Sequence, residues 1–194
     1  LGLARGSGTR SLAGMPPRRG VFARPLLGLR RTTTAACCAE QGLDPWSDPH
    51  NADPAYARVR VRTRVLPVLE AELGPGVAEA LARTALLARA DADALDALAA
   101  AAAPAGVPAD GVPADGVPTD RDPHCGHLAG LDRALRTRRL RAWLEECGVA
   151  DLSASHVDAV ERLVVAWHGQ RGVDVPGGRV VRVEGRLRLR PLRR

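Results

Sequence analysis

Apolar residues in the C-terminal third of the chain repeat with the period of a helix, and they do so twice. The first set stops at Gly148 and consists of Leu131, Leu135, Leu140, Leu144 and Cys147. The second set opens after Leu152-Ser153, ends before Gly169 and Gly172, and consists of Val157, Val160, Val164 and Trp167. We therefore expect two helices here, each with these side chains turned inward.

A β-hairpin is expected after these helices. The segment from Arg179 to Arg190 consists of Arg and apolar residues on both sides of Glu184-Gly185, a dipeptide suited to a tight turn. Val175-Pro176-Gly177-Gly178 marks a turn before this segment. We expect the apolar face of the hairpin to consist of Val181, Val183, Leu187 and Leu189.

The N-terminal part is richer in loop signals. Residues 1–20 form a Gly/Ser/Arg-rich loop closed by Pro16-Pro17, and a short extended piece is expected from Val21 to Leu29. A helix is predicted over 30–42, where Gly42 ends it. The turn cluster 44–54 then leads into a helix that Asn51 or Asp53 can cap, with Pro54 in its first turn.

Residues 58–65 carry two conflicting patterns. Their strict alternation, RVRVRTRV, has the period of a strand. The cap signals before them and the continuation Leu66-Pro67-Val68-Leu69-Glu70 favour a helix broken near Pro67, which is our prediction. After Gly74-Pro75-Gly76 a further helix is expected to run to about residue 100. Its apolar stripe would be Leu81, Ala85, Leu95 and Leu98.

A proline repeat separates the two parts of the chain. Residues 104–120 contain GVPAD-GVPAD-GVPTD, in which Pro at every fifth position excludes a helix and nothing can form a core. We expect a linker over 104–122. Deletion of 106–120 should therefore change the melting of the flanking domains little.

Charge is distributed unevenly along the chain. All 28 cationic residues are Arg, and the formal net charge is +6. Segment 1–35 carries +7, 36–127 carries −7, 128–178 is neutral and 179–194 carries +6. Basic ends around an acidic middle suit a polyanion held at two places, although ordinary solvated surfaces give the same pattern.

Composition excludes several classes of protein. Aromatic residues make up only 3% of the chain, so a core must rest on Leu and Val, and collagen-like and disulfide-dense secreted classes are excluded. The four cysteines include no CxxC pair, and no signal peptide or apolar run of ~20 residues is present, so we expect a cytoplasmic protein outside membranes.

His124-Cys125-Gly126-His127 lacks a second cluster at zinc spacing, so no metal site is expected. The start at Leu1, inside a Gly/Arg-rich loop, indicates a truncated chain.

Two groups of residues are candidates for anion binding. In Arg5-Gly6-Ser7-Gly8-Thr9-Arg10, glycine lets backbone N–H groups approach a phosphate and Arg adds a forked donor, but a flexible surface loop has the same composition. Arg58 and Arg62 share one face at helical spacing and can hold a phosphate or carboxylate between them. Asp48 and Asn51 can orient these guanidinium groups, or Asn51 can simply cap the helix.

Taken in order, these segments resemble the C-terminal two thirds of a tRNA(Ile)-lysidine synthetase of short, actinobacterial-like form. The resemblance rests on LARGSGTRSLAGMPP at 3–17, RPLL at 24–27 and WSDPHNADPAYARVRVRTRVLP at 46–67. It continues in the terminal segments LRAWLEECGV and HVDAVERLVVAWHGQRGVDVPGG. It covers nearly the whole chain except the 104–120 repeat.

The resemblance implies an ATP-dependent ligase that modifies tRNA. The family uses ATP, with Mg²⁺, to adenylate the C2 oxygen of the wobble cytidine in the isoleucine tRNA that carries a CAU anticodon. The ε-amine of free L-lysine then attacks C2 and releases AMP, which leaves lysidine. The implied partners are therefore this tRNA and free lysine.

The resemblance also implies site residues, none of them assigned as catalytic. The loop beside the nucleotide and the modified base would contain Arg5, Gly6, Ser7, Gly8 and Arg10. A signature facing the active site would contain Asp48, Asn51, Arg58 and Arg62. The tRNA-facing part of the C-terminal domain would contain Arg136, Arg138, Arg139 and Arg141.

The implied fold is α/β followed by a small α+β domain. Residues 1–72 would be the C-terminal part of a Rossmann-like ATP-pyrophosphatase (PP-loop) domain of the adenine-nucleotide alpha-hydrolase class. Residues 75–103 would be a helical connector, 104–122 the linker and 123–194 a helix–hairpin domain that binds tRNA.

The sequence departs from the family pattern in ways that leave rivals open. The family's SGGxDS and HHxDDQxET motifs do not occur, and His50 stands where a small residue such as Ser is expected. We therefore expect that this chain alone does not make lysidine. One alternative is a non-catalytic RNA-binding module that uses the two basic ends. Another is a tRNA thiolase of the same fold, although Cys37-Cys38 is not the CxxC pair expected there.

Overall fold

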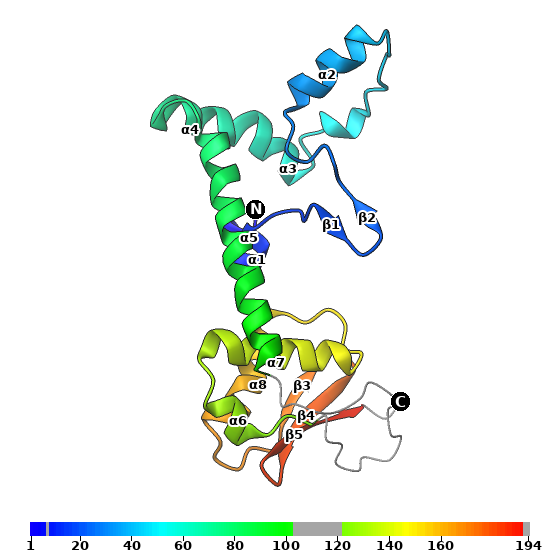
Figure 1. The fold of residues 1–194 in the computed structure, drawn as a ribbon. Helices are drawn as coiled ribbons and strands as arrows, with labels where there is room; N and C mark the ends of the chain where they lie inside the picture. Colours follow the sequence, from blue (N-terminus) through cyan, green and yellow to red (C-terminus); the bar gives the residue numbers. More distant parts are fainter. Residues whose placement is uncertain (7, 103–121, 192–194) are drawn as a thin grey trace. The chain divides into compact units, whose positions relative to one another are not determined.

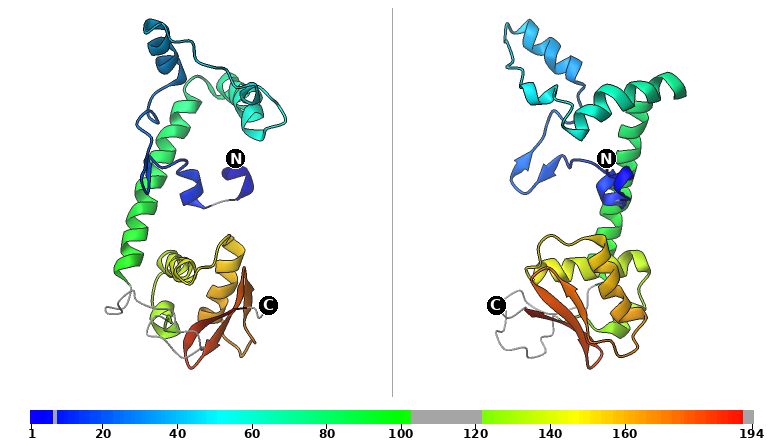
Figure 2. Two further views of the ribbon diagram at one scale, coloured as in Figure 1. Left: turned by 90° about the vertical axis from the view of Figure 1, so that its right-hand side faces the viewer. Right: turned by 180° about the vertical axis from the view of Figure 1, so that it is seen from behind.

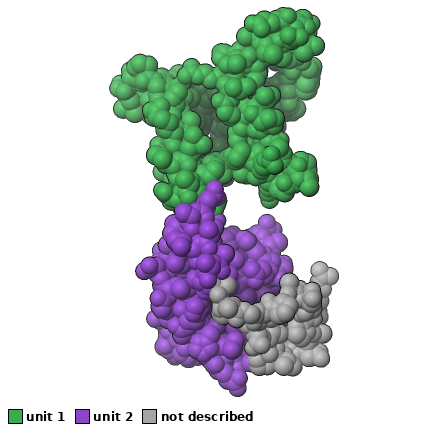
Figure 3. Space-filling model, in the orientation of Figure 1, with its two compact units in different colours: residues 1–92 green, residues 93–194 purple. Residues whose placement is uncertain are grey.

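The computed structural model describes residues 1–6, 8–102 and 122–191, and it divides into two compact units, 1–92 and 93–194 (Figure 3). The boundary between them falls inside helix α5 (Val77–Ala101), within the segment expected to be the connector. The proline repeat lies outside the described residues, and so does all of the expected linker except Asp122.

Unit 1 begins with short elements: η1 (Leu3–Arg5), α1 (Thr9–Leu12), β1 (Arg18–Arg19) and β2 (Phe22–Ala23) (Figure 1). β1 and β2 form a two-residue antiparallel hairpin. The extended piece expected from Val21 to Leu29 is therefore much shorter than predicted. The chain turns after β2, where the amide of Leu27 donates to the carbonyl of Arg24, and Pro25 has no N–H to extend a strand. The predicted helix over 30–42 is confirmed as α2 (Arg31–Glu40), followed by Gly42 at φ +65°.

The segment with conflicting patterns is helical. A 3₁₀ turn, η2 (Pro49–Asn51), precedes α3 (Ala57–Arg60), a π-helical turn η3 (Val61–Val65) and α4 (Leu66–Leu73). The helical prediction is thus confirmed, and so is an interruption close to Pro67, because a π-helical turn ends at Val65 and α4 begins at Leu66. Pro67 lies in the first turn of α4, where its missing N–H is tolerated.

The expected helix caps are also wrong. Helix α3 begins at Ala57, and its N-cap residue Tyr56 makes no side-chain capping bond. Asp53 instead accepts the amide of Ala55 at 2.8 Å, which closes a turn around Pro54.

The long helix α5 is confirmed, but its predicted buried stripe is not. Leu81 and Leu98 are each more than half exposed. Among the described residues of α5, the buried ones are Ala92 and Ala99. The helix therefore makes its closest contacts through small side chains, and most of its leucines are exposed in the described structure.

Unit 2 has a continuous hydrophobic core. Its elements are α6 (Cys125–Ala129), α7 (Arg133–Glu146), α8 (Ala154–Val165), β3 (Val173–Val175), β4 (Gly178–Val183) and β5 (Arg186–Pro191). The strands form one antiparallel sheet in the order β3-β4-β5, and the helices lie on one face of it (Figure 2). Helix α8 packs against α6 and α7 and also against β3 and β4. Fully buried side chains include Leu140, Leu144, Val160, Leu163, Val180 and Leu187.

Two details of the predicted helices of unit 2 are wrong. Cys147 is exposed and lies beyond the end of α7, whereas Trp143, which is only 3% exposed, fills the core. Trp167 lies beyond α8 and remains 39% exposed. The start of α8 is as predicted, because Ser153 and His156 form a reciprocal capping box.

The hairpin is confirmed, but its predicted apolar face is only half right: Leu187 and Leu189 lie on the core face, whereas Val181 and Val183 do not. Glu184 and Gly185 both have positive φ, so they form a two-residue turn that pairs Val183 with Arg186. Paired residues point to the same face. The core face is therefore set by Val180 opposite Leu189 and by Leu187 opposite Arg182. Val181 and Val183 lie on the other face, alongside the Arg residues of β5.

Among the helices of the described ranges, none has both the length and the apolar character needed to cross a membrane.

Candidate functional site

The glycine-rich loop near the N-terminus is open. Gly6 has φ +62°, and its amide donates to the carbonyl of Leu3 at 3.0 Å. No heavy atom lies within 4 Å of the position that a Cβ would take at Gly6 or Gly8. Ser7 lies outside the described residues. Because α1 is a single turn, an anion here would depend on the glycine amides and on Arg side chains rather than on a helix dipole.

A residue that the sequence did not point to holds this loop in place. Arg89, on α5, donates hydrogen bonds to the carbonyls of Ala13, Gly14 (3.2 Å) and Met15 (3.0 Å). These carbonyls directly follow α1. No spacing rule connects residues so far apart in the chain, so nothing in the sequence distinguishes Arg89 from Arg83, the other Arg of this Ala-rich helix.

Two arginines fasten the turn cluster to the helical segment that follows it. Arg60 donates to the carbonyls of Pro54 and Ala55, each at 2.7 Å. Arg62 donates to the carbonyl of Asn51. Asn51 thus contributes its backbone oxygen rather than a side-chain cap.

The acidic residue of this cluster also has a local role. The carboxylate of Asp48 accepts the amide of His50 at 2.9 Å and lies 2.9 Å from Nδ1 of the same residue. The His50 ring in turn contacts Tyr56 edge to face, with 5.8 Å between the ring centroids. Asp48 and His50 therefore fix the turn in which they lie.

The predicted pair Arg58 and Arg62 is not brought onto a common partner. The π-helical turn begins between them and changes the helical spacing on which the prediction relied. Arg62 is engaged with Asn51, whereas Arg58 makes no hydrogen bond or ion pair with any residue the structure describes. Arg58 is the cation of this signature that is available to an external anion.

In unit 2, the first of the four proposed tRNA-facing arginines is structural. Nε of Arg136 lies 2.9 Å from a Glu161 oxygen, and Nη1 donates to the carbonyl of Leu131 at 2.7 Å. The Arg136 side chain is 11% exposed. Its guanidinium thus holds the loop before α7 to helix α8.

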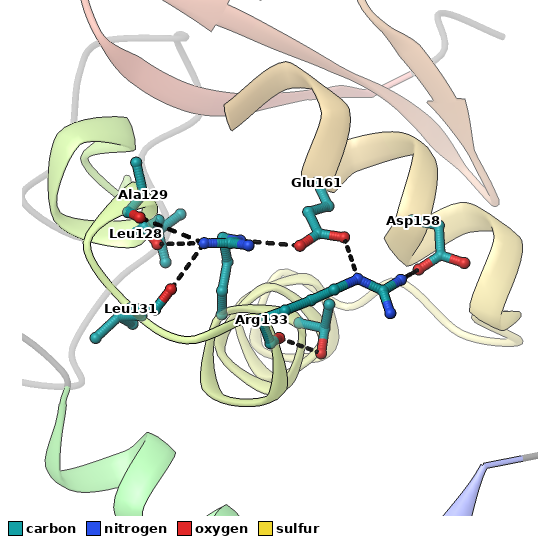
Figure 4. Close-up of polar contacts among 8 residues, drawn as sticks. Leu128, Ala129, Leu131, Arg133, Asp158 and Glu161 are labelled. Atoms are coloured by element: carbon teal, nitrogen blue, oxygen red, sulfur yellow. Dashed lines mark hydrogen bonds and ion pairs between the residues drawn. The ribbon is translucent and has the colours of Figure 1, made fainter. Parts of the chain in front are cut away.

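Glu161 is the centre of this network (Figure 4). It is 6% exposed, and its second oxygen lies 3.1 Å from Nε of Arg133, which also pairs with Asp158 at 2.9 Å. The hydrogen bond that Arg133 donates to Glu161 raises the pKa of the Arg133 guanidinium. A buried carboxylate with two guanidinium partners satisfies the rule that buried charge must be paired.

The other three arginines of the group line a shallow pocket of about 300 Å³ with Asp96, Glu145 and Glu146. Arg138 pairs with Asp96 at 2.8 Å. Arg141 donates to the carbonyl of Leu152 and lies 3.7 Å from Glu145. Arg139 has no hydrogen-bond or ion-pair partner within the described ranges.

The Arg-rich outer face of the hairpin is balanced by acidic residues. Arg179 pairs with Asp174 through two bonds of 2.6 and 2.8 Å, which lower the pKa of that carboxyl. Arg188 lies 3.6 Å from Glu184 and 3.8 Å from Asp122. The number of Arg residues on this face therefore overstates its positive charge.

The His-Cys-Gly-His segment has structural roles. Nδ1 of His124 accepts the amide of Gly126, and Nε2 of His127 lies 2.7 Å from the carbonyl of Ala102. Burial raises the pKa of the Cys125 thiol, which disfavours the thiolate that binds metals. Nowhere in the described ranges do three His, Cys, Asp or Glu side chains gather as metal ligands would.

Comparison with protein families gives two matches in order along the chain. Residues 1–69 match the PP-loop domain, and residues 124–188 match the TilS substrate binding domain. An α/β PP-loop region followed by this domain is thus present. The finer Rossmann-like layout of unit 1 stays a prediction, because its described strands form only the short β1-β2 hairpin.

Curated relatives give a consistent result. The chain is 55% identical over 192 residues to the tRNA(Ile)-lysidine synthase of Leifsonia xyli, a match that covers 98% of this chain and 56% of the relative. It is 52% identical over 184 residues to that of Thermobifida fusca, covering 92% and 53%. It is 47% identical over 175 residues to that of Mycobacterium tuberculosis, covering 90% and 52%.

The chain thus spans about half the length of the relatives it matches, and nearly all of its own length takes part in each match. The resemblance expected from the sequence is confirmed: this chain is similar throughout to the tRNA(Ile)-lysidine synthases.

Proposed function

We propose that this chain is part of a tRNA(Ile)-lysidine synthase. That enzyme would use ATP, with Mg²⁺, to join free L-lysine to C2 of the wobble cytidine in the CAU-anticodon isoleucine tRNA. The observation that carries the proposal is the order of two matches in one chain, a PP-loop domain followed by a TilS substrate binding domain. We place the enzyme in the cytoplasm, on the cysteine pattern of the sequence.

The proposed division of labour follows the domain boundaries expected from the sequence. Residues 1–72 would border the nucleotide, 75–103 would connect, 104–122 would link and 123–194 would bind tRNA. ATP, when bound, supplies the adenylyl group that makes the C2 oxygen a leaving group. Beside it, the amides of Gly6 and Gly8, with Arg5 and Arg10, would offer donors to phosphate oxygens.

Of the four signature residues Asp48, Asn51, Arg58 and Arg62, we propose that one, an arginine, makes the main contact with a bound anion. Arg58 would neutralise phosphate or carboxylate charge, because its guanidinium has no partner among the described residues. Asp48, Asn51 and Arg62 would hold the turn beside it through the contacts described above. Arg89 would fix the chain after the glycine-rich loop.

On the tRNA side, we propose Arg138, Arg139 and Arg141 as phosphate contacts and exclude Arg136. Arg139 would contribute most, since it breaks no existing ion pair to bind. Arg136 would have to leave Glu161 buried and unpaired, which is costly.

The test has two parts. First, the chain 1–194 should bind the CAU-anticodon isoleucine tRNA with an affinity that falls steeply with salt. It should form no lysidine with ATP and lysine, because its sequence contains neither SGGxDS nor HHxDDQxET. Second, a fusion of this chain with the part of the Leifsonia xyli relative that the match leaves uncovered should form lysidine.

Each outcome has a meaning. A fusion that folds and binds ATP but forms no lysidine, while 1–194 binds many RNAs alike, would support the non-catalytic RNA-binding module instead. Absence of tRNA binding by both proteins would overturn the proposed function.

A further inference from the structure

An aromatic side chain just beyond the C-terminal end of α8 lies outside the hydrophobic core of unit 2. Trp167 follows the helix and is 39% exposed, whereas Trp143, the other tryptophan of unit 2, is almost fully buried. Val165, on the last turn of α8, is half exposed as well. A large, flat apolar surface is therefore available to a ligand at this point.

The orientation of the indole is fixed by a cation. The guanidinium carbon of Arg182 lies 5.4 Å from the centroid of the Trp167 ring, within cation–π range. Nη1 of Arg182 donates to the carbonyls of Leu163 (3.0 Å) and Val164 (3.3 Å) at the end of α8. Since those carbonyls form the negative end of the helix dipole, the guanidinium is held there, and the ring beside it is oriented before any ligand binds.

The loop that carries Trp167 is closed by its own hydrogen bonds. The amide of His168 donates to Oε1 of Gln170 at 2.8 Å, and Nε2 of Gln170 donates to the carbonyl of Ala166 at 3.2 Å. Nδ1 of His168 lies 3.0 Å from that same carbonyl. The loop would thus lose little conformational entropy when a ligand binds to it.

Two unpaired cations flank the loop in sequence. Arg162 lies in the last turn of α8, and Arg171 follows Gln170. Both are exposed, and the guanidinium of neither has a hydrogen-bond or ion-pair partner in the part of the chain that the structure describes. An anionic ligand is favoured here over a neutral apolar one.

We propose that Trp167 is a stacking platform for an unpaired base of the bound tRNA, with Arg182 as its positioning residue. The inference rests on the proposed function, since it names the part of the tRNA that this end of unit 2 contacts. Exposed aromatic rings next to unpaired cations are how proteins bind single-stranded nucleic acid, because the ring stacks on a base and the cations contact phosphates.

The test compares substitutions of Trp167 in the chain 1–194. Binding is measured to the tRNA and to a fully paired RNA duplex without unpaired bases. Trp167→Ala and Trp167→Leu should weaken tRNA binding about 5- to 100-fold, whereas Trp167→Phe, which keeps a ring, should retain most of it. Duplex binding should change little in all three.

The salt dependence separates stacking from charge. Trp167→Leu should leave the slope of log K against log salt unchanged, because a stacked base releases no counterions. Arg139→Ala, outside this loop, should lower that slope by about one without a preference for unpaired bases.

A second measurement reports on the indole itself and is made in a Trp46→Phe background, because Trp46 is 82% exposed and could also be quenched. In that background binding of tRNA should quench tryptophan fluorescence, and adding Trp167→Phe to the folded protein should abolish the quenching. Wild-type tRNA affinity in a folded Trp167→Leu variant, or quenching that survives in Trp167→Phe, would overturn the platform while leaving the proposed function intact. If the unmodified chain binds no tRNA, both proposals fail.

Discussion

At the scale of single residues, arginine in this protein serves mainly as a donor to backbone carbonyls and to paired carboxylates. Arg89 binds three successive carbonyls, and Arg136 binds a carbonyl and a buried carboxylate. The sequence could not distinguish these residues from Arg58 or Arg139, which have no such partners among the described residues. All of them carry the same charge, and only the fold decides which guanidinium finds an acceptor.

The buried carboxylate in unit 2 should matter more than its exposed neighbour. Glu161→Gln removes a charge shared by Arg133 and Arg136 and should lower the free energy of unfolding by about 3 kcal/mol. The matched control, Asp158→Asn, breaks only an exposed pair with Arg133 and should cost less than about 1 kcal/mol. Urea unfolding followed by tryptophan fluorescence measures both. Equal losses of unfolding free energy in the two variants would show that burial does not increase what the Glu161 ion pairs contribute to stability.

A second carboxylate should give unit 1 a dependence on pH. Glu70 accepts the amides of Ala78 (2.9 Å), Val77 and Gly76 at the start of α5. The bond from Ala78 is the largest cause that lowers the pKa of Glu70. Because the folded pKa lies below the unfolded value, this contact stabilises fully above the ordinary Glu pKa and is lost as pH falls through the folded pKa.

A carbon-13 NMR titration of the Glu70 carboxyl should therefore give a midpoint below that of an unstructured peptide. Glu70→Gln should loosen the first turn of α5 at neutral pH, seen as faster amide exchange at Ala78. Glu72→Gln is the control, because Glu72 makes no contact with that turn within the described structure. A midpoint at the peptide value would contradict the capping role.

At the scale of elements, the sequence predicted which segments are helical or extended better than it predicted their faces. Helix α2, the helical nature of 57–73, helix α5, helices α7 and α8, and the hairpin were all predictable, because periodicity and glycine stops are local signals. Faces were less predictable. The turn of the hairpin was predicted correctly, but the valines of β4 were assigned to the wrong face. β4 carries Val on both faces, at 180 and at 181 and 183, so its pattern alone does not decide which of them faces the core.

The residues of the candidate site also fall into those that the sequence could predict and those that it could not. Its glycine-rich loop and its Arg signature were found from the sequence, since they depend on residue type and spacing. The anchoring Arg89 and the neutralisation of Arg136 by Glu161 depend on contacts between distant segments, for which the sequence holds no local signal.

The corrected hairpin face can be tested directly. Val180→Ala removes a fully buried side chain and should destabilise unit 2 by about 2 kcal/mol. Val183→Ala, on the opposite face, should cost less than about 1 kcal/mol. Thermal or urea unfolding of the two variants ranks them. A larger loss of stability for Val183→Ala than for Val180→Ala would mean that Val183 faces the core, as expected from the sequence alone.

The anchor of the glycine-rich loop makes a second prediction for an element. Arg89→Ala should free the carbonyls after α1 and speed amide exchange at Ala13 and Gly14 about tenfold, as expected for loss of a charged hydrogen bond. Arg83→Ala is the control, because Arg83 is exposed on the same helix and has no partner there in the described structure. Equal exchange in both variants would show that Arg89 does not hold the loop.

At the scale of the whole molecule, the two units differ in how they bury apolar side chains. The buried residues described in unit 1 are Ala13, Val59 and Ala92, whereas unit 2 has a continuous core of Leu, Val and Trp. Unit 1 also holds most of the exposed large apolar side chains, among them Phe22, Trp46 and Leu87. Exposed apolar surface of this extent is typical of a surface that another part of a protein covers.

Residues 93–194, expressed alone, should therefore unfold in one cooperative transition. Residues 1–92 alone should show no cooperative transition and should bind a hydrophobic dye such as ANS. Calorimetry and dye fluorescence measure this contrast. A sharp heat-absorption peak from 1–92 would mean that its few buried side chains suffice for stability.

The engagement of guanidinium groups with carbonyls has a consequence for the kinetics of association. A guanidinium bound to a carbonyl keeps its full charge, so it still draws a polyanion toward the protein over roughly a Debye length of 8 Å. It cannot, however, release its carbonyl to grip a phosphate without leaving that oxygen unsatisfied. For Arg89, Arg136 and Arg182, charge would thus act on the rate of encounter. The residence time of the complex would depend on arginines such as Arg58 and Arg139, which have no partner among the described residues.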